Sequence, residues 1–332
     1  MRKFGLLSTV VMMALTAGSV LAQDATTETV LGDLTNPAGI AIQPKTGHVF
    51  VSDSGAGRVI RVVDGKAQEV IVGFPKDVYG KGPMYDIGPL GLVFLDEKTL
   101  VIGGGGLPDG EEMLRVYEVP EAGAEPIKAD AMVSSYKLEG TDDIKGEGNF
   151  YGVAATKDAV YVTSNGDDTK GWVGKAAIKG SKVESFVRSI ATKEAVNVDA
   201  PVGVTISPRG EVVIGQMGEI SVPNDGLVSF YGASDGKLLL NVETGLSDIT
   251  ALAYSPKSEQ LYATDFSWHD TSMGGLFQLV SKREDGKQTV DAKKVTSLDK
   301  PTAMAFGEDG TLYITVIGEP GKGKLLKIGP GL

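Results

Sequence analysis

Residues 36–53 read NPAGIAIQPKTGHVFVSD, and this stretch recurs in five further forms along the chain. Each copy has a small residue inside a short apolar run, then a turn, then a second apolar run rich in Val, Leu and Tyr. A repeat of this length is typical of a solenoid or a propeller. The other copies are GPLGLVFLDEKTLVIGG (88–104), NFYGVAATKDAVYVTSN (149–165), APVGVTISPRGEVVIGQM (200–217), DITALAYSPKSEQLYATD (248–265) and KPTAMAFGEDGTLYITV (300–316).

The small residues recur at spacings of 52, 61, 51, 48 and 52 residues. We expect them to lie on the innermost strands, where Gly or Ala lets converging backbones approach closely. They are therefore packing residues and not phosphate-binding ones. We call these six positions the anchors: Gly39, Gly91, Gly152, Gly203, Ala251 and Ala303.

The composition of each repeat predicts an all-β fold. The apolar runs are dense in β-branched and aromatic residues, and turns such as KTG, PRG and EDG join them into hairpins. A third strand follows each hairpin, and a fourth follows in five repeats, with the second repeat's fourth strand within residues 126–138. Four-stranded sheets arranged radially make a six-bladed β-propeller.

The sixth repeat ends at its third strand, so its fourth must come from elsewhere. Residues 27–34, TETVLGDL, form a spare strand-like segment before the first repeat. We predict that they complete the last blade and close the ring, which removes exposed strand edges. Residues 23–332 then form a single propeller domain.

The first 22 residues have the pattern of a secretory signal peptide. Arg2 and Lys3 precede an apolar run that ends in AGSVLA, which predicts cleavage after Ala22. The alternative is a membrane anchor, for which the run is too short to span about 30 Å of hydrocarbon. We therefore expect a periplasmic or secreted protein without a membrane anchor after cleavage.

Composition excludes several classes of function. The net charge of −11 disfavours nucleic acid as a partner. The absence of cysteine excludes thiol nucleophiles, zinc–thiolate sites and iron–sulfur clusters. Neither a Gly-x-Ser-x-Gly elbow nor an HExxH motif is present, so a serine-triad hydrolase and a zinc peptidase have no sequence support.

The first repeat and the segment after it resemble an NHL repeat, which has a Pro-x-Gly, a turn Gly, an apolar strand, an Asp and an Arg. More broadly, the chain resembles the TolB-like six-bladed propellers, which include strictosidine synthases, gluconolactonases and paraoxonases. Later repeats lose the Asp–Arg pair; Val316 stands where the first repeat has Asp53. The matching residues are Pro37, Gly39, Gly47, Val51, Asp53 and Arg58.

The resemblance implies a calcium ion at the mouth of the channel, held by residues just before the inner strands. The corresponding positions that carry an amide or a carboxylate are Asn36, Asn149 and Asp248. Oxygen ligands of this kind suit calcium. No Glu occupies an equivalent position, and Lys300 stands at that of the sixth repeat.

Blade topology sorts the loops into two faces. The loops between second and third strands, and those between blades, share one face, where the inner strands begin. On this face we expect Asp53 and Asp265, at the ends of second strands, and the adjoining Trp268 and His269 to bind a ligand. An aromatic plane beside polar groups suits a sugar or another partly apolar ligand. The alternative for Asp53 is that it only pairs with Arg58 and braces its own blade.

Two functions remain open. The first is a non-enzymatic binding propeller whose loop-rich face takes a protein, a peptide or a glycan. The second is a metal-dependent esterase, lactonase or related lyase at the channel mouth, with His269 as the general base. If Trp268 and His269 do not form the site, the insertion from Tyr79 to Tyr85 is the next place to look.

Overall fold

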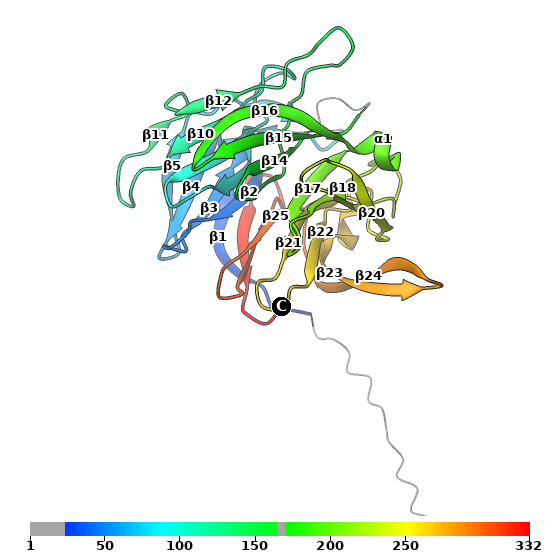
Figure 1. Ribbon diagram of the computed structural model, residues 1–332. Helices are drawn as coiled ribbons and strands as arrows, with labels where there is room; N and C mark the ends of the chain where they lie inside the picture. The colour runs from blue at the N-terminus through cyan, green and yellow to red at the C-terminus, as the bar shows by residue number, and fades with distance from the viewer. Residues whose placement is uncertain (1–23, 81, 165–169, 199) are drawn as a thin grey trace, which may run out of the picture.

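The computed structural model of this protein describes residues 24–80, 82–164, 170–198 and 200–332 (Figure 1). The expected signal peptide and its cleavage site lie outside the described residues. Among the residues described, no helix has the length and apolar character needed to cross a membrane.

The fold is a six-bladed β-propeller, as predicted. Six sheets stand around a central axis, each with its first strand innermost and antiparallel neighbours outward (Figure 1). The alternating apolar runs form these sheets because each blade buries both of its faces against its neighbours. The core cluster around Phe50, Leu92 and Tyr117, for example, joins the first two blades.

The strands are given from the first blade to the sixth. The innermost are β2 (Pro37–Ile42), β8 (Pro89–Phe94), β13 (Val153–Ala155), β17 (Pro201–Ile206), β21 (Ile249–Tyr254) and β25 (Pro301–Phe306). The second are β3 (Val49–Asp53), β9 (Thr99–Gly104), β14 (Ala159–Thr163), β18 (Val212–Gln216), β22 (Leu261–Asp265) and β26 (Leu312–Val316). The third are β4 (Arg58–Val63), β10 (Leu114–Glu118), β15 (Trp172–Lys179), β19 (Leu227–Tyr231), β23 (Gly275–Glu284) and β27 (Gly323–Ile328). The fourth are β5 (Lys66–Val72), β12 (Ser134–Tyr136), β16 (Lys182–Ala191), β20 (Leu238–Glu243), β24 (Lys287–Ser297) and β1 (Glu28–Leu34).

The N-terminal strand closes the ring. Strand β1 pairs antiparallel with β27 and is the outermost strand of the last blade, from Glu28 opposite Lys327 to Leu34 opposite Gly323. Leu34 is buried in the cluster that also holds Leu325. The predicted closure by residues 27–34 is confirmed.

The second blade departs from the regular pattern. Its outer strand β12 has three residues, whereas β16 and β24 have 10 and 11. The chain between β10 and β12 first crosses to the first blade, where β11 (Ile127–Lys128) pairs in parallel with β5. The predicted fourth strand within residues 126–138 is therefore present but short, and the first blade gains a fifth strand.

The six anchors line a narrow space on the axis between the inner strands. A Cβ added at Gly39 would lie 2.0 Å from the carbonyl oxygen of Leu90 on the next blade. At Gly91 it would lie 2.3 Å from the carbonyl oxygen of Tyr151. The expected close approach of converging backbones is present.

Several short elements lie on the face where the inner strands begin, which we call the mouth face. An insertion between β5 and β8 forms a hairpin of β6 (Asp77–Tyr79) and β7 (Tyr85–Ile87). One turn of 3-10 helix, η1 (Ser54–Ala56), follows β3, and another, η2 (Thr271–Met273), follows β22. The single α-helix among the described residues, α1 (Thr192–Val196), joins the third blade to the fourth.

Candidate functional site

A small cavity opens at the centre of the mouth face. Its volume is about 60 Å³, and residues from all six blades or their connections surround it. None of these residues carries a charged side chain. The lining consists of Asn36, Tyr79, Tyr85, Ile87, Tyr151, Val202, Met217, Thr250, Phe266, Trp268 and Ile317.

The end of β22 positions one aromatic wall of the cavity. The carboxylate of Asp265 accepts hydrogen bonds from the backbone N–H groups of Ser247 (3.1 Å), Asp248 (2.8 Å) and Ser267 (2.9 Å). These bonds join the loop before β21 to the loop after β22, and Ser267 adopts a φ of 51°. Asp265 is thus buried and acts as a brace that holds Phe266 and Trp268 at the mouth.

Aromatic packing shapes the cavity. The Trp268 ring stacks on Phe266, with centroids 4.8 Å apart and an angle of 21° between the rings. Tyr85 of the β6–β7 hairpin meets Trp268 edge-on at 5.8 Å. Two of the regions expected to form the site, the loop with Trp268 and the insertion from Tyr79 to Tyr85, therefore meet at a single cavity.

The tyrosine hydroxyl of Tyr85 has an unusual environment. It is buried, and it has no hydrogen-bond partner among the described residues. Burial, together with the carboxylate of Asp299, raises the pKa of Tyr85, and burial raises the pKa of Tyr151 far above its ordinary value. A buried hydroxyl without a partner is costly. The surroundings of these two tyrosines therefore disfavour charge.

Asp53 lies away from this cavity lining. Its side chain is buried, accepts a hydrogen bond of 2.6 Å from the Thr35 backbone N–H, and pairs with Arg58 at 2.8 Å. Both oxygens are used within the first blade and the turn that enters it. These contacts match the bracing role that the sequence left open as the alternative for Asp53.

His269, the candidate general base of a hydrolytic mechanism, is exposed and is not among the residues that line the cavity. Its neighbour Asp270 accepts hydrogen bonds from the Ser272 backbone N–H (3.1 Å) and hydroxyl (2.6 Å). The carboxylate beside His269 therefore caps η2. The geometry brings Trp268 to the site and leaves His269 at the surface.

The three proposed calcium ligands do not make a calcium site. Asn36 lines the cavity, and its side-chain nitrogen donates to the carbonyl oxygen of Asp86 at 2.8 Å. Asn149 and Asp248 are not among the lining residues. No three His, Cys, Asp or Glu side chains come together for a metal within the described part of the chain. One carboxylate is too few for a cation that prefers several charged oxygens.

The structure offers another reason for asparagine before the inner strands. Asn36, Asn149, Ala200 and Lys300 all have φ between 48° and 57°. Asparagine tolerates this left-handed conformation better than most residues. The turn that enters the inner strand therefore explains the two amides without a metal.

Asp248 is a buried acid whose charge is disfavoured. Burial, with added repulsion from Asp265 and Asp225, raises the pKa of its carboxyl to about 7, although a hydrogen bond from the Trp268 backbone N–H (2.5 Å) works in the opposite direction. The folded-state pKa thus lies above the ordinary value of 3.8. The contribution of Asp248 to the free energy of unfolding is fully present below pH 3.8, and it is lost as the pH rises through the folded-state pKa of about 7.

We expect Asp248→Asn to stabilise the protein at pH 8 by about 1 to 3 kcal/mol, because Asn stays neutral and still accepts from the Trp268 N–H. The gain should shrink towards pH 4.5, where Asp248 is protonated in the folded protein. Thermal unfolding of both proteins at the two pH values measures this. Asp285→Asn, at an exposed hairpin tip, serves as the control. An equal gain at both pH values would rule out titration of Asp248 as the cause.

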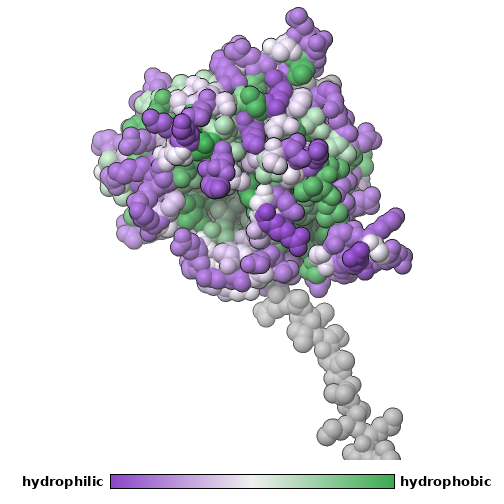
Figure 2. Space-filling view, in the orientation of Figure 1, coloured by the Kyte–Doolittle hydropathy of each residue, from purple (hydrophilic) through white to green (hydrophobic). Residues whose placement is uncertain are grey.

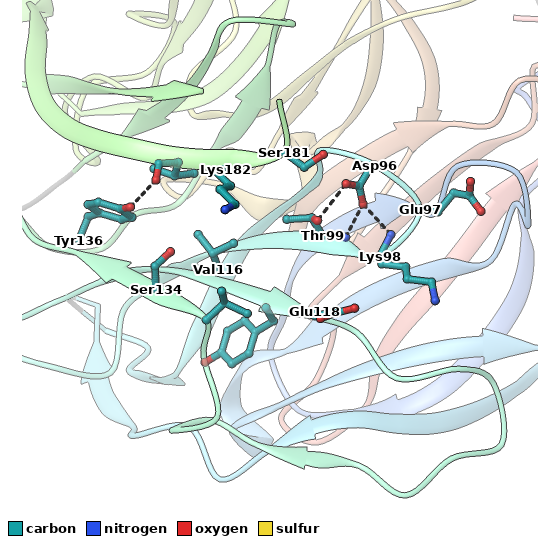
Figure 3. Close-up of a pocket in the computed structure, with 13 residues that line it drawn as sticks. Asp96, Glu97, Lys98, Thr99, Val116, Glu118, Ser134, Tyr136, Ser181 and Lys182 are labelled. Carbon is teal, nitrogen blue, oxygen red and sulfur yellow. Dashed lines mark hydrogen bonds between the residues drawn. The ribbon is translucent and has the colours of Figure 1, made fainter. Parts of the chain in front are cut away.

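A larger open groove, of about 760 Å³, lies on the rim between the second and third blades (Figure 3). Its charged groups are largely engaged with protein partners. Asp96 accepts from the backbone N–H groups of Lys98 and Thr99, and Lys98 pairs with Glu121 at 3.0 Å. Figure 2 likewise shows hydrophilic side chains over most of the visible face, with apolar ones in separate patches. Among its described lining residues, the groove carries no unpartnered buried group comparable with the Tyr85 hydroxyl.

Several residues that line the cavity were not predicted from the sequence. Tyr151, Val202 and Thr250 each stand one residue before an anchor, and Met217 and Ile317 each follow the last residue of a second strand. The six aligned repeats could have predicted these residues. Because the inner strands begin and the second strands end on the mouth face, the residues directly before the anchors and directly after the second strands must converge there.

These observations define a class: a six-bladed β-propeller with an uncharged aromatic cavity where its channel opens. No protein-family model matches the sequence, and no curated protein matches it significantly. Among solved structures, the fold is similar to an oxidoreductase from Thermus thermophilus that is described as a glucose dehydrogenase. The two are 17% identical, with a TM-score of 0.63 over 92% of this chain and 99% of the other.

Two further solved structures share the fold. A soluble aldose sugar dehydrogenase from Escherichia coli is 13% identical, with a TM-score of 0.58 over 92% of this chain and 100% of its own. A gluconolactonase from Xanthomonas campestris is 14% identical, with a TM-score of 0.57 over 92% and 91% of the two chains. The resemblance to gluconolactonase-like six-bladed propellers is thereby confirmed at the level of the fold.

Proposed function

We propose that this protein is an exported binding propeller that takes a small uncharged group into the aromatic cavity of its mouth face. The observation that carries the proposal is the uncharged cavity itself, which Trp268, Phe266 and Tyr151 help to wall on the mouth face. The absence of charged side chains in the lining favours a neutral group.

The cavity volume limits the size of the enclosed group. A water molecule needs a cavity volume of about 10 to 15 Å³, counted as the space open to a sphere of its size. The 60 Å³ of this cavity therefore hold about four to six non-hydrogen atoms. A hexose or its lactone has about a dozen. The cavity therefore accommodates an apolar branch or one edge of a larger ligand, and it does not enclose a whole sugar.

The second candidate, a metal-dependent esterase or lactonase, draws support from the gluconolactonase among the structures of the same fold. Against it stands the donor set of Asn36, Asn149 and Asp248, which does not fit a calcium ion. His269 also lies outside the cavity lining.

The test uses a neutral probe of matching size, isobutyramide, and the emission of Trp268. We expect saturable binding that weakens about tenfold in Trp268→Ala, which removes the stacked wall. Tyr85→Leu should weaken it about fivefold, since it removes the aromatic ring that meets Trp268 edge-on. Because Trp268→Ala removes the fluorophore, its affinity for isobutyramide is measured by calorimetry.

His269→Ala is the matched control, because it changes the adjoining loop without touching the cavity, and it should bind the probe normally. Each variant's melting temperature establishes that it folds. Assays with lactones and aryl esters, with and without EDTA, test the alternative. A stoichiometric metal with chelator-sensitive turnover would overturn the proposal in favour of the hydrolase.

A further inference from the structure

The mouth face carries an unusual share of exposed apolar side chains. Of the nine large apolar side chains exposed in the described residues, five lie on mouth-face loops. Val78, Tyr79 and Met84 belong to the β6–β7 hairpin, with 52%, 37% and 57% of their surface exposed. Val222 lies in the loop after β18, and Met273 lies in η2. Apolar groups gathered around a pocket are typical of a protein-binding surface.

The same loops are acidic. Asp77, Glu219 and Asp270 are exposed, and each stands two residues from a residue that lines the cavity: Tyr79, Met217 and Trp268. None of the three has a salt bridge to a described lysine or arginine. Of the described lysines near these loops, Lys76 pairs with Asp86 (3.8 Å) and Lys300 with Asp299 (3.5 Å), whereas Lys294 donates to the Met273 carbonyl oxygen at 3.1 Å. We call these three exposed carboxylates, none of which has a salt bridge to a described residue, the acidic collar of the cavity.

Cavity size and collar charge together specify a partner. The cavity holds about four to six non-hydrogen atoms, which matches one aliphatic side chain such as leucine. The acidic collar attracts positive charges on either side of that group. A free neutral ligand would leave the collar and the exposed apolar side chains unused.

We propose that the mouth face docks a basic peptide segment of a partner protein, which inserts one aliphatic side chain into the cavity that Trp268 and Tyr85 help to line, while flanking lysines or arginines face Asp77, Glu219 and Asp270. This inference rests on the proposed function, since it uses the same cavity.

The experiment titrates the purified full-length mature protein with synthetic peptides and follows Trp268 emission. The probe is acetyl-Lys-Lys-Leu-Lys-amide. We expect it to bind, with affinity falling as salt is raised, because exposed charges are screened. Replacing its leucine with alanine should weaken binding about tenfold. The glutamate counterpart, acetyl-Glu-Glu-Leu-Glu-amide, should not bind measurably.

Two matched triple variants separate the collar from general charge. Asp77→Asn with Glu219→Gln and Asp270→Asn should weaken binding of the lysine peptide about tenfold and leave isobutyramide binding unchanged. Glu125→Gln with Glu259→Gln and Glu308→Gln makes the same change in net charge away from the mouth, and it should bind like the parent.

The outcomes distinguish the two proposals. If isobutyramide binds the cavity but the lysine peptide does not, the binding cavity stands and the peptide inference is wrong. If lysine and glutamate peptides bind equally, the collar does not select the partner, and the inference is again wrong. If neither isobutyramide nor any peptide binds, both proposals are wrong.

Discussion

A chain truncated to begin at Asn36 is expected to melt about 10 °C or more below the full mature protein. The truncation removes β1, so β27 loses its outer partner along the register from Glu28 to Leu34. It also uncovers Leu325, which Leu34 helps to bury. The last blade would then present an unpaired edge to solvent, which promotes aggregation as well as unfolding.

Differential scanning calorimetry measures this effect. A chain beginning at Glu28, which retains all of β1, is the control and should melt like the parent. Light scattering during the scan should show earlier aggregation for the chain that begins at Asn36. If that chain melts like the parent, β1 does not close the ring in solution.

Gly39→Val is expected to prevent formation of the native propeller. A Cβ at position 39 would stand 2.0 Å from the Leu90 carbonyl oxygen and 3.1 Å from the Ser52 hydroxyl. The first contact is with backbone, which cannot move without separating the first two blades. Ser52 also donates to the same carbonyl oxygen at 2.6 Å, so this junction has no free volume. We expect a loss of about 4 kcal/mol or more, at the severe end of single substitutions.

Soluble yield and far-ultraviolet circular dichroism report the outcome for Gly39→Val. Gly32→Ala provides the control, since no atom lies within 4 Å of the added Cβ. Gly39→Ala, with the same Cβ and no further atoms, keeps the prediction measurable if the valine variant is insoluble. A native melting temperature for Gly39→Ala would contradict the proposed close approach of the inner strands.

The raised pKa of Asp248 depends on the tertiary structure and cannot be derived from the repeat sequence alone. By position Asp248 is one of six equivalent residues before an anchor. Its pKa of about 7 comes from burial and from Asp265 and Asp225, which approach it from the end of β22 and the loop after β18. A repeat alignment identifies such a position, but it does not indicate which charges surround it.

The sequence by itself determined the architecture. The spacing of the anchors predicts six blades, the unfinished sixth repeat predicts closure by residues 27–34, and the Asp53–Arg58 pair is already apparent in the first repeat. These features depend on local alternation and on contacts between consecutive strands, which recur within about fifty residues. Periodicity of this kind is visible along the chain.

Only the tertiary structure decided what the mouth contains. Tyr85, Tyr151 and Trp268 come from connections of three different blades, and they meet because the ring brings the starts of its inner strands to one point. The crossing of β11 to the first blade, where it pairs in parallel with β5, is likewise visible only in the folded structure. Convergence on an axis joins residues more than a hundred positions apart, and no local pattern records which side chains will share the space there.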